Sequence, residues 1–330
     1  MLGTGSYGQV WLATLPGSNG TPQEVLALKV QPKYQLLQSS NPQRIIAEKN
    51  ILASLHSPFV SRLYYACQDE RRLYMMTELL QGGELKTLLP EEGLSESAAR
   101  FYAAGILEGL THMHRKHILH RDVKTENVLL NTKGYPVLID FGFAKYVPDK
   151  TFTFCGSPIL MAPEIIRYKG HDKGADHWSW AVTIYRMVTG RYPFFERGVT
   201  ELDLYKKICK GSFELNGLMS MEFRLLMTAV LYPDPSQRLG SRANGWRDIF
   251  AAPWFANDPS LNLSKLRKQT LQAPWVPDVK DVLDDSRFHS DPSIEDLIED
   301  NQCFKITTEQ QKVYQTFGPM VESVGTHVYS

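Results

Sequence analysis

The sequence predicts an α+β fold of two lobes, a small β-rich lobe followed by a large α-rich lobe, with an extended C-terminal tail. Short apolar runs of strand character dominate the first 80 residues, and apolar residues recur at helical spacing after Gly82 and Gly83. From about residue 256 the chain is rich in Pro, Asp and Ser and has few apolar clusters. We therefore expect lobes at residues 1–80 and 81–255 and a tail at residues 256–330.

The small lobe is expected to contain strands and one helix. Its strand-like runs are residues 7–15, 25–30, 60–66 and 72–80. Residues 16–22 are dense in turn formers and predict a hairpin loop. Residues 42–55 place apolar side chains near helical spacing, with Pro42 close to the start, and predict the helix.

The large lobe is expected to be mainly helical. Its helical runs are residues 95–117, 174–190 and 221–232. Ser95 is expected to be the N-cap of the first helix. Two short apolar runs, residues 128–130 and 137–139, predict strands within the helical lobe.

Composition excludes several classes of protein. The 36 Lys and Arg balance the 36 Asp and Glu, so a neutral chain is not expected to bind nucleic acid or an acidic membrane by bulk electrostatics. No apolar run approaches the roughly 18 residues of a membrane helix, and the first residues lack a signal-peptide pattern. The four cysteines form no C-x-x-C pair. We expect a soluble, cytoplasmic protein with neither a nucleic acid nor a membrane as partner.

A glycine-rich turn opens the chain. Gly3, Gly5 and Gly8 would let backbone N–H groups lie against phosphate oxygens without Cβ clashes. A plain glycine-rich turn would show the same pattern. A Rossmann nucleotide fold has the same glycine spacing, but its loop leads into a helix, whereas Val10 and Trp11 continue here as a strand.

Lys29 lies inside an apolar strand, where an unpaired charge is costly to desolvate. Glu48, flanked by apolar residues on the next helix, is its natural partner. The alternatives are an edge lysine that points to solvent and a solvated helix glutamate.

A second polar cluster suits phosphoryl transfer. Asp122, Lys124 and Asn127 lie within six residues, next to an apolar strand. A carboxylate can accept a hydroxyl proton, an ammonium can neutralise the moving phosphoryl group, and an amide oxygen can ligate a metal. Asp140 follows another apolar run as part of D-F-G and is a candidate magnesium carboxylate.

These motifs occur in the order glycine loop, strand lysine, helix glutamate, H-R-D…N, D-F-G and A-P-E (162–164). Over roughly residues 1–255 the chain therefore resembles a eukaryotic protein kinase. The segments D-F-G-F-A-K (140–145), T-F-T-F-C-G-S-P (151–158) and R-L-G (238–240) resemble the AGC group.

Three further segments, at 82–89, 169–172 and 266–277, are most similar to the cGMP-dependent kinases, with the cAMP-dependent catalytic subunit close behind. The tail resembles the AGC C-terminal extension. The resemblance implies a bilobal protein-kinase-like fold and a serine/threonine protein kinase that uses ATP and Mg²⁺ on protein substrates, in cyclic-nucleotide-type signalling.

The resemblance also implies roles for residues. The catalytic residues would be Asp122, Lys124, Lys29 and Glu48, with Asn127 and Asp140 as Mg²⁺ ligands. Thr77 would be the gatekeeper, and Glu78 and Leu80 would supply hinge hydrogen bonds. The residues implied to bind the nucleotide are Leu2, Gly3, Thr4, Gly5, Ser6, Tyr7, Gly8, Val10, Ala27, Lys29, Thr77, Glu78, Leu80, Glu84, Glu126, Asn127, Leu129 and Asp140.

The resemblance places a regulatory threonine in the loop after D-F-G. Thr153 would be phosphorylated, and Arg121, Lys145 and Arg44 would receive its phosphate. Ser157 matches a hydroxyl that bonds the catalytic Asp and Lys.

By the same resemblance, substrates are read by acidic and apolar groups. Glu84 would bind an arginine three residues before the acceptor, and Glu126 is also retained. Phe154, Pro158 and Met161 would form an apolar pocket for the residue after the acceptor. Arg186 and Ile159 stand where relatives carry glutamates, so we expect weakened selection for an arginine two residues before the acceptor.

Other matches are structural. Glu164 and Arg238 resemble a buried ion pair, Asp176 resembles the residue that braces the catalytic loop, and Thr125 replaces a usual proline. In the tail, Phe288 lacks its aromatic partner, because Asp291 stands there. Tyr314 and Phe317 resemble a closing aromatic pair, with a loosely docked tail as the alternative.

Two questions stay open at this point. The first strand looks truncated, so the chain is either a fragment of a longer polypeptide or has a misassigned start, and a regulatory domain or subunit would lie outside it. A pseudokinase or scaffold that binds nucleotide without efficient transfer is the main alternative function, and a small-molecule kinase is another.

Overall fold

The computed structural model describes residues 2–5, 8–16, 22–217, 219–242, 244–281, 283–284, 287 and 306–321. Ser6, Tyr7, Phe288 and Asp291 lie outside the described residues. The chain divides into two compact units. Unit 1 consists of Met1–His56, Ser61–Gly83 and Asp278–Ser330, and unit 2 consists of Ser57–Val60 and Glu84–Pro277.

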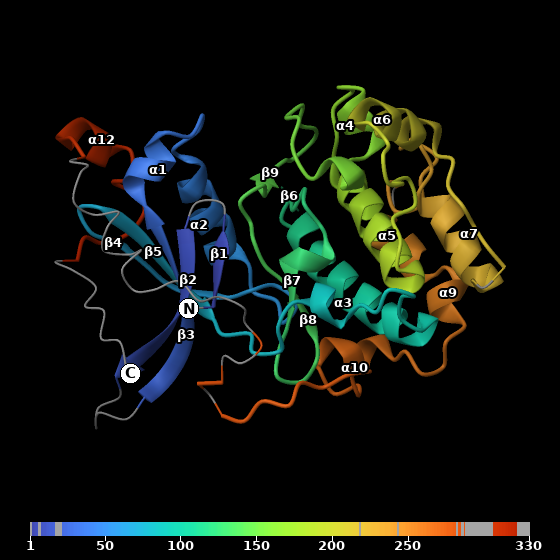
Figure 1. The fold of residues 1–330 in the computed structure, drawn as a ribbon, viewed down its shortest axis with the longest axis horizontal. Helices are drawn as coiled ribbons and strands as arrows, with labels where there is room; N and C mark the ends of the chain where they lie inside the picture. The colour runs from blue at the N-terminus through green and yellow to red at the C-terminus, as the bar shows by residue number, and fades with distance from the viewer. Residues whose placement is uncertain are drawn as a thin grey trace. The chain divides into compact units, whose positions relative to one another are not determined.

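Unit 1 is built on an antiparallel five-stranded sheet with the strand order β1-β2-β3-β5-β4 (Figure 1). The strands are β1 (Gly3–Gly5), β2 (Gly8–Pro16), β3 (Pro22–Pro32), β4 (Leu63–Gln68) and β5 (Arg72–Glu78). β1 is a strand of three residues at the edge of the described sheet and pairs with β2. Two helices, α1 (Lys33–Leu37) and α2 (Arg44–Ser54), follow β3. The sequence predicts α2 but not α1, because a five-residue helix is too short for a periodic signal.

The end of the chain completes the core of unit 1. Helix α12 (Thr308–Lys312) lies beside α1 in Figure 1, and it is followed by Tyr314 and Phe317, which are 0% and 1% exposed. Both rings join a buried cluster whose other members are Leu36, Ile45, Leu73 and Met75. The aromatic pair is therefore firmly docked, and the alternative of a loosely docked tail is wrong for these residues.

Polar contacts hold the same segment. The buried Lys33 donates from Nζ to the carbonyl of Asp69 and to Gln311 Oε1, each at 2.6 Å. Gln68 Nε2 donates to the carbonyls of Tyr314 (3.0 Å) and Gly318 (2.8 Å). These bonds satisfy polar groups that burial would otherwise penalise.

Unit 2 is mainly helical. Its two long helices, α3 (Glu96–His114) and α5 (Lys173–Thr189), pack against each other (Figure 1). Ser95 Oγ accepts the N–H of Ala98 at 3.3 Å, so the predicted N-cap is confirmed. The remaining helices are α4 (Pro163–Ile166), α6 (Glu201–Lys210), α7 (Met221–Val230), α8 (Trp246–Phe250), α9 (Pro253–Ala256) and α10 (Leu263–Arg267).

Short strands and 3₁₀ turns carry the loops of unit 2. The strands are β6 (Ile118–Leu119), β7 (Val128–Leu130), β8 (Pro136–Leu138) and β9 (Lys145–Tyr146), and the turns are η1 (Leu85–Leu88), η2 (Thr125–Asn127) and η3 (Pro158–Leu160). β7 pairs with β8, and β6 pairs with β9. α3 approaches β8 closely: a Cβ on Gly109 would lie 2.9 Å from a methyl of Leu138. The glycine therefore lets the helix rest directly on the hairpin that carries the candidate site.

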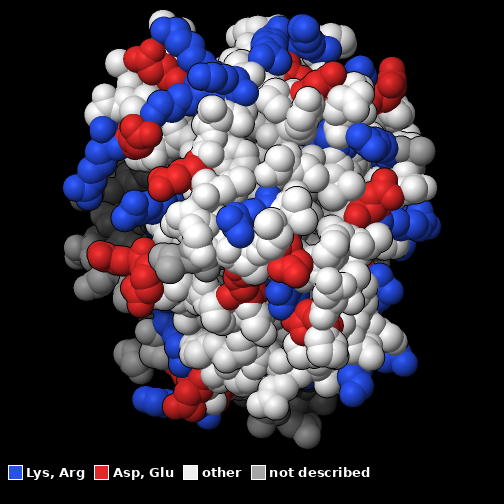
Figure 2. All heavy atoms as spheres, turned by 90° about the vertical axis from the view of Figure 1, so that its right-hand side faces the viewer, with Lys and Arg blue, Asp and Glu red and all other residues white. Residues whose placement is uncertain are grey.

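Charged side chains of both signs are interspersed on the face drawn in Figure 2, as the balanced composition predicts. Among the described residues, no helix is long and apolar enough to cross a membrane.

Candidate active site

Lys29 and Glu48 form an ion pair within unit 1. Lys29 Nζ donates to Glu48 Oε1 at 2.7 Å, from β3 to α2. Glu48 is buried and the Lys29 side chain is about a quarter exposed, so the pair joins the helix to the sheet in a partly desolvated site. The predicted pairing of Lys29 with Glu48 is confirmed.

The glycine-rich turn is a hairpin between β1 and β2. Gly3 pairs with Val10 and Gly5 pairs with Gly8, while the two residues at its tip lie outside the described residues. A Cβ on Gly8 would lie 2.2 Å from the carbonyl oxygen of Val30, so only glycine fits there. Gly8 is thus required for the approach of β2 to β3, a packing role that the sequence does not reveal.

The other predicted nucleotide contacts of unit 1 lie on adjacent strands. Ala27 pairs with Thr77, and Val10 pairs with Lys29. Leu2 and Leu80 are buried. The Glu78 amide donates to the carbonyl of Arg62, so the backbone N–H of Glu78 is already paired.

The carboxylate of Asp122 is the centre of the site in unit 2. Its Oδ1 accepts from the hydroxyl of Ser157 at 2.8 Å and from the amide of the same residue at 3.1 Å. Its Oδ2 lies 2.7 Å from Lys124 Nζ and accepts from Asn127 Nδ2 at 3.0 Å. Asp122 is 3% exposed, so four donors surround a desolvated carboxylate.

These donors determine the charge state of the site. Burial acts to raise the pKa of Asp122, but hydrogen bonds from Lys124 and Ser157 outweigh it, so the pKa lies below the ordinary 3.8. Burial likewise acts to lower the pKa of Lys124, and its bond to Asp122 raises it instead. Both groups are therefore charged at neutral pH.

Asp176, near the start of α5, holds the loop that carries Asp122. Its Oδ1 accepts the N–H of Arg121 at 2.7 Å, and its Oδ2 accepts the N–H of His120 at 2.9 Å. His114 Nε2 lies 2.7 Å from the same Oδ2. The bond to Arg121 stabilises a non-glycine residue with φ of 66°. The predicted bracing role of Asp176 is therefore confirmed.

Two oxygen-bearing residues of unit 2 suit a hard divalent cation. Asn127 directs its amide nitrogen at Asp122, which leaves its amide oxygen as the atom able to ligate a metal. The N–H of Ile139 donates to the Asn127 carbonyl at 3.0 Å. Because Asp140 follows Ile139, Asn127 and Asp140 lie at neighbouring strand ends. Within the described residues, no group of three or more His, Cys, Asp or Glu could hold a metal alone. One carboxylate and one amide, completed by phosphate and water oxygens, fit the requirements of Mg²⁺.

The threonine of the loop after D-F-G lies next to a lysine. Lys145 Nζ donates to Thr151 Oγ1 at 2.9 Å and to Thr153 Oγ1 at 3.3 Å, and Thr153 is exposed. Arg121 Nε donates to the carbonyl of Phe143 at 2.7 Å, which ties the loop to the H-R-D segment. Arg44, the third predicted phosphate contact, is the first residue of α2 in unit 1.

The predicted substrate residues lie in unit 2. Glu84 is exposed at the start of η1, and its backbone forms a bridge with Leu129. Pro158 is exposed and Met161 is buried. Phe154 stacks on Tyr168 with ring centroids 5.2 Å apart.

Lys86 was not singled out by the sequence analysis. Its Nζ lies 3.3 Å from Glu126 Oε1, although the two residues are 40 positions apart. The sequence did contain one signal for Lys86, its position two residues after Glu84. A cation at that position changes the charge of the acidic surface expected for substrate binding.

The A-P-E segment is anchored by the predicted ion pair. Glu164 accepts two bonds from the guanidinium of Arg238, each at 2.7 Å, and both side chains are buried. The bidentate geometry and the surrounding carbonyl acceptors compensate the desolvation of both charges.

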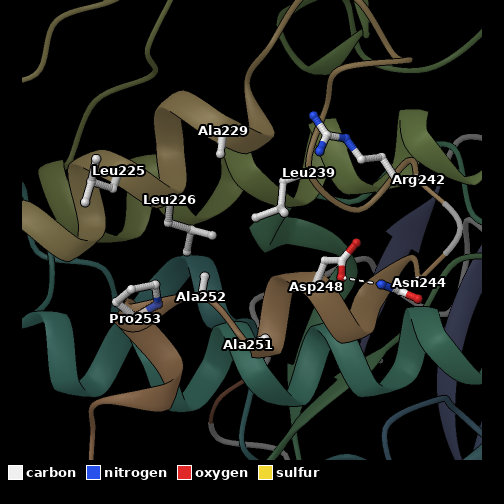
Figure 3. Close-up of a pocket in the computed structure, with 10 residues that line it drawn as sticks. All are labelled: Leu225, Leu226, Ala229, Leu239, Arg242, Asn244, Asp248, Ala251, Ala252 and Pro253. Atoms are coloured by element: carbon white, nitrogen blue, oxygen red, sulfur yellow. Dashed lines mark hydrogen bonds between the residues drawn. The ribbon is translucent and has the colours of Figure 1, made fainter.

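A separate pocket of about 700 Å³ lies in unit 2 among α7, α8 and α9 (Figure 3). Leu225, Leu226 and Leu239 form much of its apolar wall, and Asp248 accepts a hydrogen bond from Asn244 at one side. None of its lining residues belongs to the candidate site.

Residues 1–255 match the family model described as protein kinase domain. The chain is 35% identical over 289 residues to the cAMP-dependent protein kinase catalytic subunit of Dictyostelium discoideum, covering 87% of this chain and 43% of the relative. It is 36% identical over 302 residues to the cGMP-dependent protein kinase egl-4 of Caenorhabditis elegans, covering 90% and 38%. It is 34% identical over 292 residues to the human cAMP-dependent protein kinase catalytic subunit PRKX, covering 88% and 79%. The chain thus spans about two fifths of the length of the first two relatives.

Proposed function

Since this chain belongs to the protein kinase family and is similar to its AGC-type members, we propose that it is a serine/threonine kinase that transfers the γ-phosphate of ATP to proteins. The observation that carries the proposal is the hydrogen bond from the Ser157 hydroxyl to Asp122 Oδ1 at 2.8 Å. It supports a carboxylate able to bind the hydroxyl of an acceptor serine or threonine in the same way.

In the proposed reaction, the acceptor oxygen forms a bond to the γ-phosphorus while the bond to the β-phosphate oxygen breaks. Asp122 orients the acceptor hydroxyl and receives its proton, and its low pKa implies that the proton moves late. Lys124, 2.7 Å from the Asp122 carboxylate, neutralises charge on the moving phosphoryl group. Asn127 and Asp140 would hold Mg²⁺, which when bound would neutralise charge on the phosphates.

The roles of the unit 1 residues are part of the same proposal. We assign the contact with the ATP phosphates to Lys29, oriented by Glu48, and to the β1–β2 hairpin. Ala27 and Val10 are proposed to contact the adenine, with Thr77 as the gatekeeper.

The proposed substrate preference is supported by one acidic residue, and the proposed signalling pathway is supported by the similarity to the relatives. We infer that Glu84 binds an arginine upstream of the acceptor, and that a regulatory domain or subunit outside these residues responds to a cyclic nucleotide. We also expect a cytoplasmic protein, because its four cysteines show no disulfide-type pairing pattern.

We propose that phosphorylation of Thr153 activates the protein. A phosphate there would add about −1.5 to −2 charge beside Lys145. Thr153→Ala should lower kcat/KM by about tenfold or more, since it removes at least one charge-assisted contact. Steady-state assays that compare the phosphorylated wild type with the variant test this. Equal turnover of the two proteins would contradict activation by Thr153 phosphorylation.

The transfer reaction itself is tested with labelled ATP, Mg²⁺ and a serine peptide that carries an upstream arginine. Asp122→Asn should lower kcat by roughly 10²–10⁴-fold, because it removes the proton acceptor. Asp203→Asn, an exposed change on α6, is the matched control and should leave turnover unchanged. Nucleotide binding by the wild type without any transfer would contradict the proposal and support the scaffold alternative.

A further inference from the structure

The carboxylate of Glu126, four residues after Asp122, is already compensated within the protein. Lys86 Nζ lies 3.3 Å from its Oε1, and Thr125 Oγ1 donates to its Oε2 at 3.1 Å. Burial acts to raise the pKa of Glu126, but backbone and Lys86 interactions lower it, so it is a paired anion at neutral pH. A cationic ligand at Glu126 would therefore compete with Lys86 for the carboxylate.

A second cation, Arg186, is held by an aromatic residue. Arg186 donates to the hydroxyl of Tyr192, and its guanidinium carbon lies 4.5 Å from the centre of the Tyr192 ring. Burial raises the pKa of Tyr192, and the charges of Glu126, Arg186 and Lys86 all act on it as well. The Lys86–Glu126 pair and the Arg186–Tyr192 pair therefore share one electrostatic environment, and we refer to these four side chains as one cluster.

The position of this cluster relative to Asp122 is fixed by the fold of unit 2. Thr183, one turn before Arg186 on α5, donates to the carbonyl of Val123 at 2.9 Å, next to Asp122. Arg186 is therefore carried on a helix that is anchored to the catalytic loop.

The cluster carries one net positive charge and is open to a ligand. Lys86 and Arg186 contribute two cations against the single anion of Glu126, and the Lys86 side chain is 48% exposed. Glu84, two residues before Lys86, forms no ion pair with any residue that the structure describes, so an acidic and a basic subsite lie side by side along η1.

We propose that Lys86, Arg186 and Tyr192 form a subsite for an acidic side chain of the substrate, next to an arginine bound by Glu84. This inference rests on the proposed function, and it places the acidic residue two positions before the acceptor, where the resemblance expects arginine in relatives. A substrate carboxylate there would receive charge-assisted hydrogen bonds from the two cations. A second arginine would meet like charges and a glutamate that is already paired.

Peptide binding tests the subsite independently of catalysis. We would compare three peptides that all carry alanine at the acceptor position and arginine three residues before it. They differ only at the position two residues before the acceptor, which is Asp, Ala or Arg. Fluorescence anisotropy should give the Asp peptide a Kd about tenfold lower than the Arg peptide, with the Ala peptide between them. Equal or tighter binding of the Arg peptide would overturn the inference.

Charge-reversal variants locate the effect. Arg186→Glu should reverse the order of the Asp and Arg peptides, and Lys86→Ala should reduce the preference severalfold. Arg186→Gln, which removes the charge without adding a new one, serves if thermal melting shows that Arg186→Glu is unfolded, and it should also reduce the preference. Arg242→Glu makes the same charge change at the pocket of Figure 3 and should leave the order unchanged.

The outcomes separate this inference from the proposed function. If Arg186→Glu and Arg186→Gln keep the wild-type Asp preference, the subsite assignment is wrong. Serine versions of the peptides measure transfer, and failure of the wild type to phosphorylate any of them counts against the kinase proposal, while the binding order of the alanine peptides still decides the subsite.

Discussion

Two residues at the candidate catalytic site have a positive φ, a backbone conformation that residues other than glycine rarely adopt. Arg121 has φ of 66° and Asp140 has φ of 58°, each next to or within a motif that the sequence singled out. Such residues cost about 1–3 kcal/mol and persist only where surrounding contacts fix them. The bond from the Arg121 amide to Asp176 and the bond from the Gly142 amide to Asp140 are those contacts. At these two positions the strained backbone lies where the chain must aim a carboxylate.

At the residue scale, Lys124→Ala should change the pH dependence of activity. The wild-type carboxylate of Asp122 stays ionised until the pH falls below 3.8, because hydrogen bonds depress its pKa. Without Lys124, burial dominates and raises that pKa, so kcat/KM should begin to fall at a higher pH than in the wild type. The value of kcat/KM at neutral pH should also fall, by roughly 10²-fold, because Lys124 no longer neutralises charge on the phosphoryl group.

Profiles of kcat/KM measured from pH 5 to 8 test this shift. Lys206→Ala, which removes an exposed lysine paired with Asp203, is the control and should reproduce the wild-type profile. A Lys124→Ala profile that is lower but parallel to the wild type would contradict the electrostatic account.

The sequence predicts contacts within a motif better than contacts between distant turns. Lys29 and Glu48 could be paired because both are charged residues in apolar surroundings, and such residues need partners. Lys86 and Glu126 could not, because each stands on a short 3₁₀ turn, where the sequence alone favours a solvated side chain. Gly8 likewise shows its packing role only when Val30 is placed beside it.

At the scale of elements, α5 is the support of the catalytic loop. Asp176 receives three donors from the loop and from α3, and it is fully buried. Burial acts to raise its pKa, but the bond from His114 and the neighbouring charges lower it to about 2. The helix therefore stabilises the loop through an anion that has no access to water.

Asp176→Asn should destabilise unit 2 by roughly 3 kcal/mol, the scale of two lost hydrogen bonds to a charged group. The native carboxylate contributes stability above its unfolded pKa of about 3.8, and this is lost as the pH falls through about 2. The deficit of the variant should therefore shrink between pH 4 and pH 2.

Urea denaturation over this pH range measures the deficit. Asp172→Asn changes the N-cap of the same helix, where asparagine caps as well as aspartate, so it should cost only a few tenths of a kcal/mol. Equal losses in both variants would show that the three contacts of Asp176 contribute no more stability than the helix cap does.

The two longest helices were predictable, whereas the capped helix α6 and the short helices were not. α3 and α5 show apolar periodicity over several turns, and Ser95 marks the start of α3. Helices α8, α9 and α10 have five residues or fewer and depend on tertiary contacts, because a helix of that length is not stable alone.

At the scale of the whole molecule, the two units differ in how the chain builds them. Unit 2 is nearly continuous, apart from Ser57–Val60, whereas unit 1 takes its residues from both ends of the chain. Tyr314 and Phe317 are separated from Leu36 and Ile45 by more than 260 positions and share one core with them. The spacing of two aromatic residues in a polar tail is a weak signal, so this return of the chain could not be predicted firmly from sequence.

Phe317→Ala should lower the free energy of unfolding of unit 1 by about 3–5 kcal/mol, as for other buried aromatic residues. Met320→Ala, a few residues away and exposed, is the matched control and should change stability by less than about 0.5 kcal/mol. Amide hydrogen exchange of β4 and β5 would localise the loss, and unchanged protection of these strands in Phe317→Ala would contradict the proposed role of the tail.

The shared core of unit 1 has a consequence for the protein during its synthesis. The ribosome releases all of unit 2 once residue 277 has emerged, so the larger unit can fold while the tail is still being made. The sheet of unit 1 emerges before unit 2, but its aromatic cluster cannot close until residue 317 is free. The sheet is therefore translated before unit 2 and completed after it, and its exposed apolar surface must be protected during that interval.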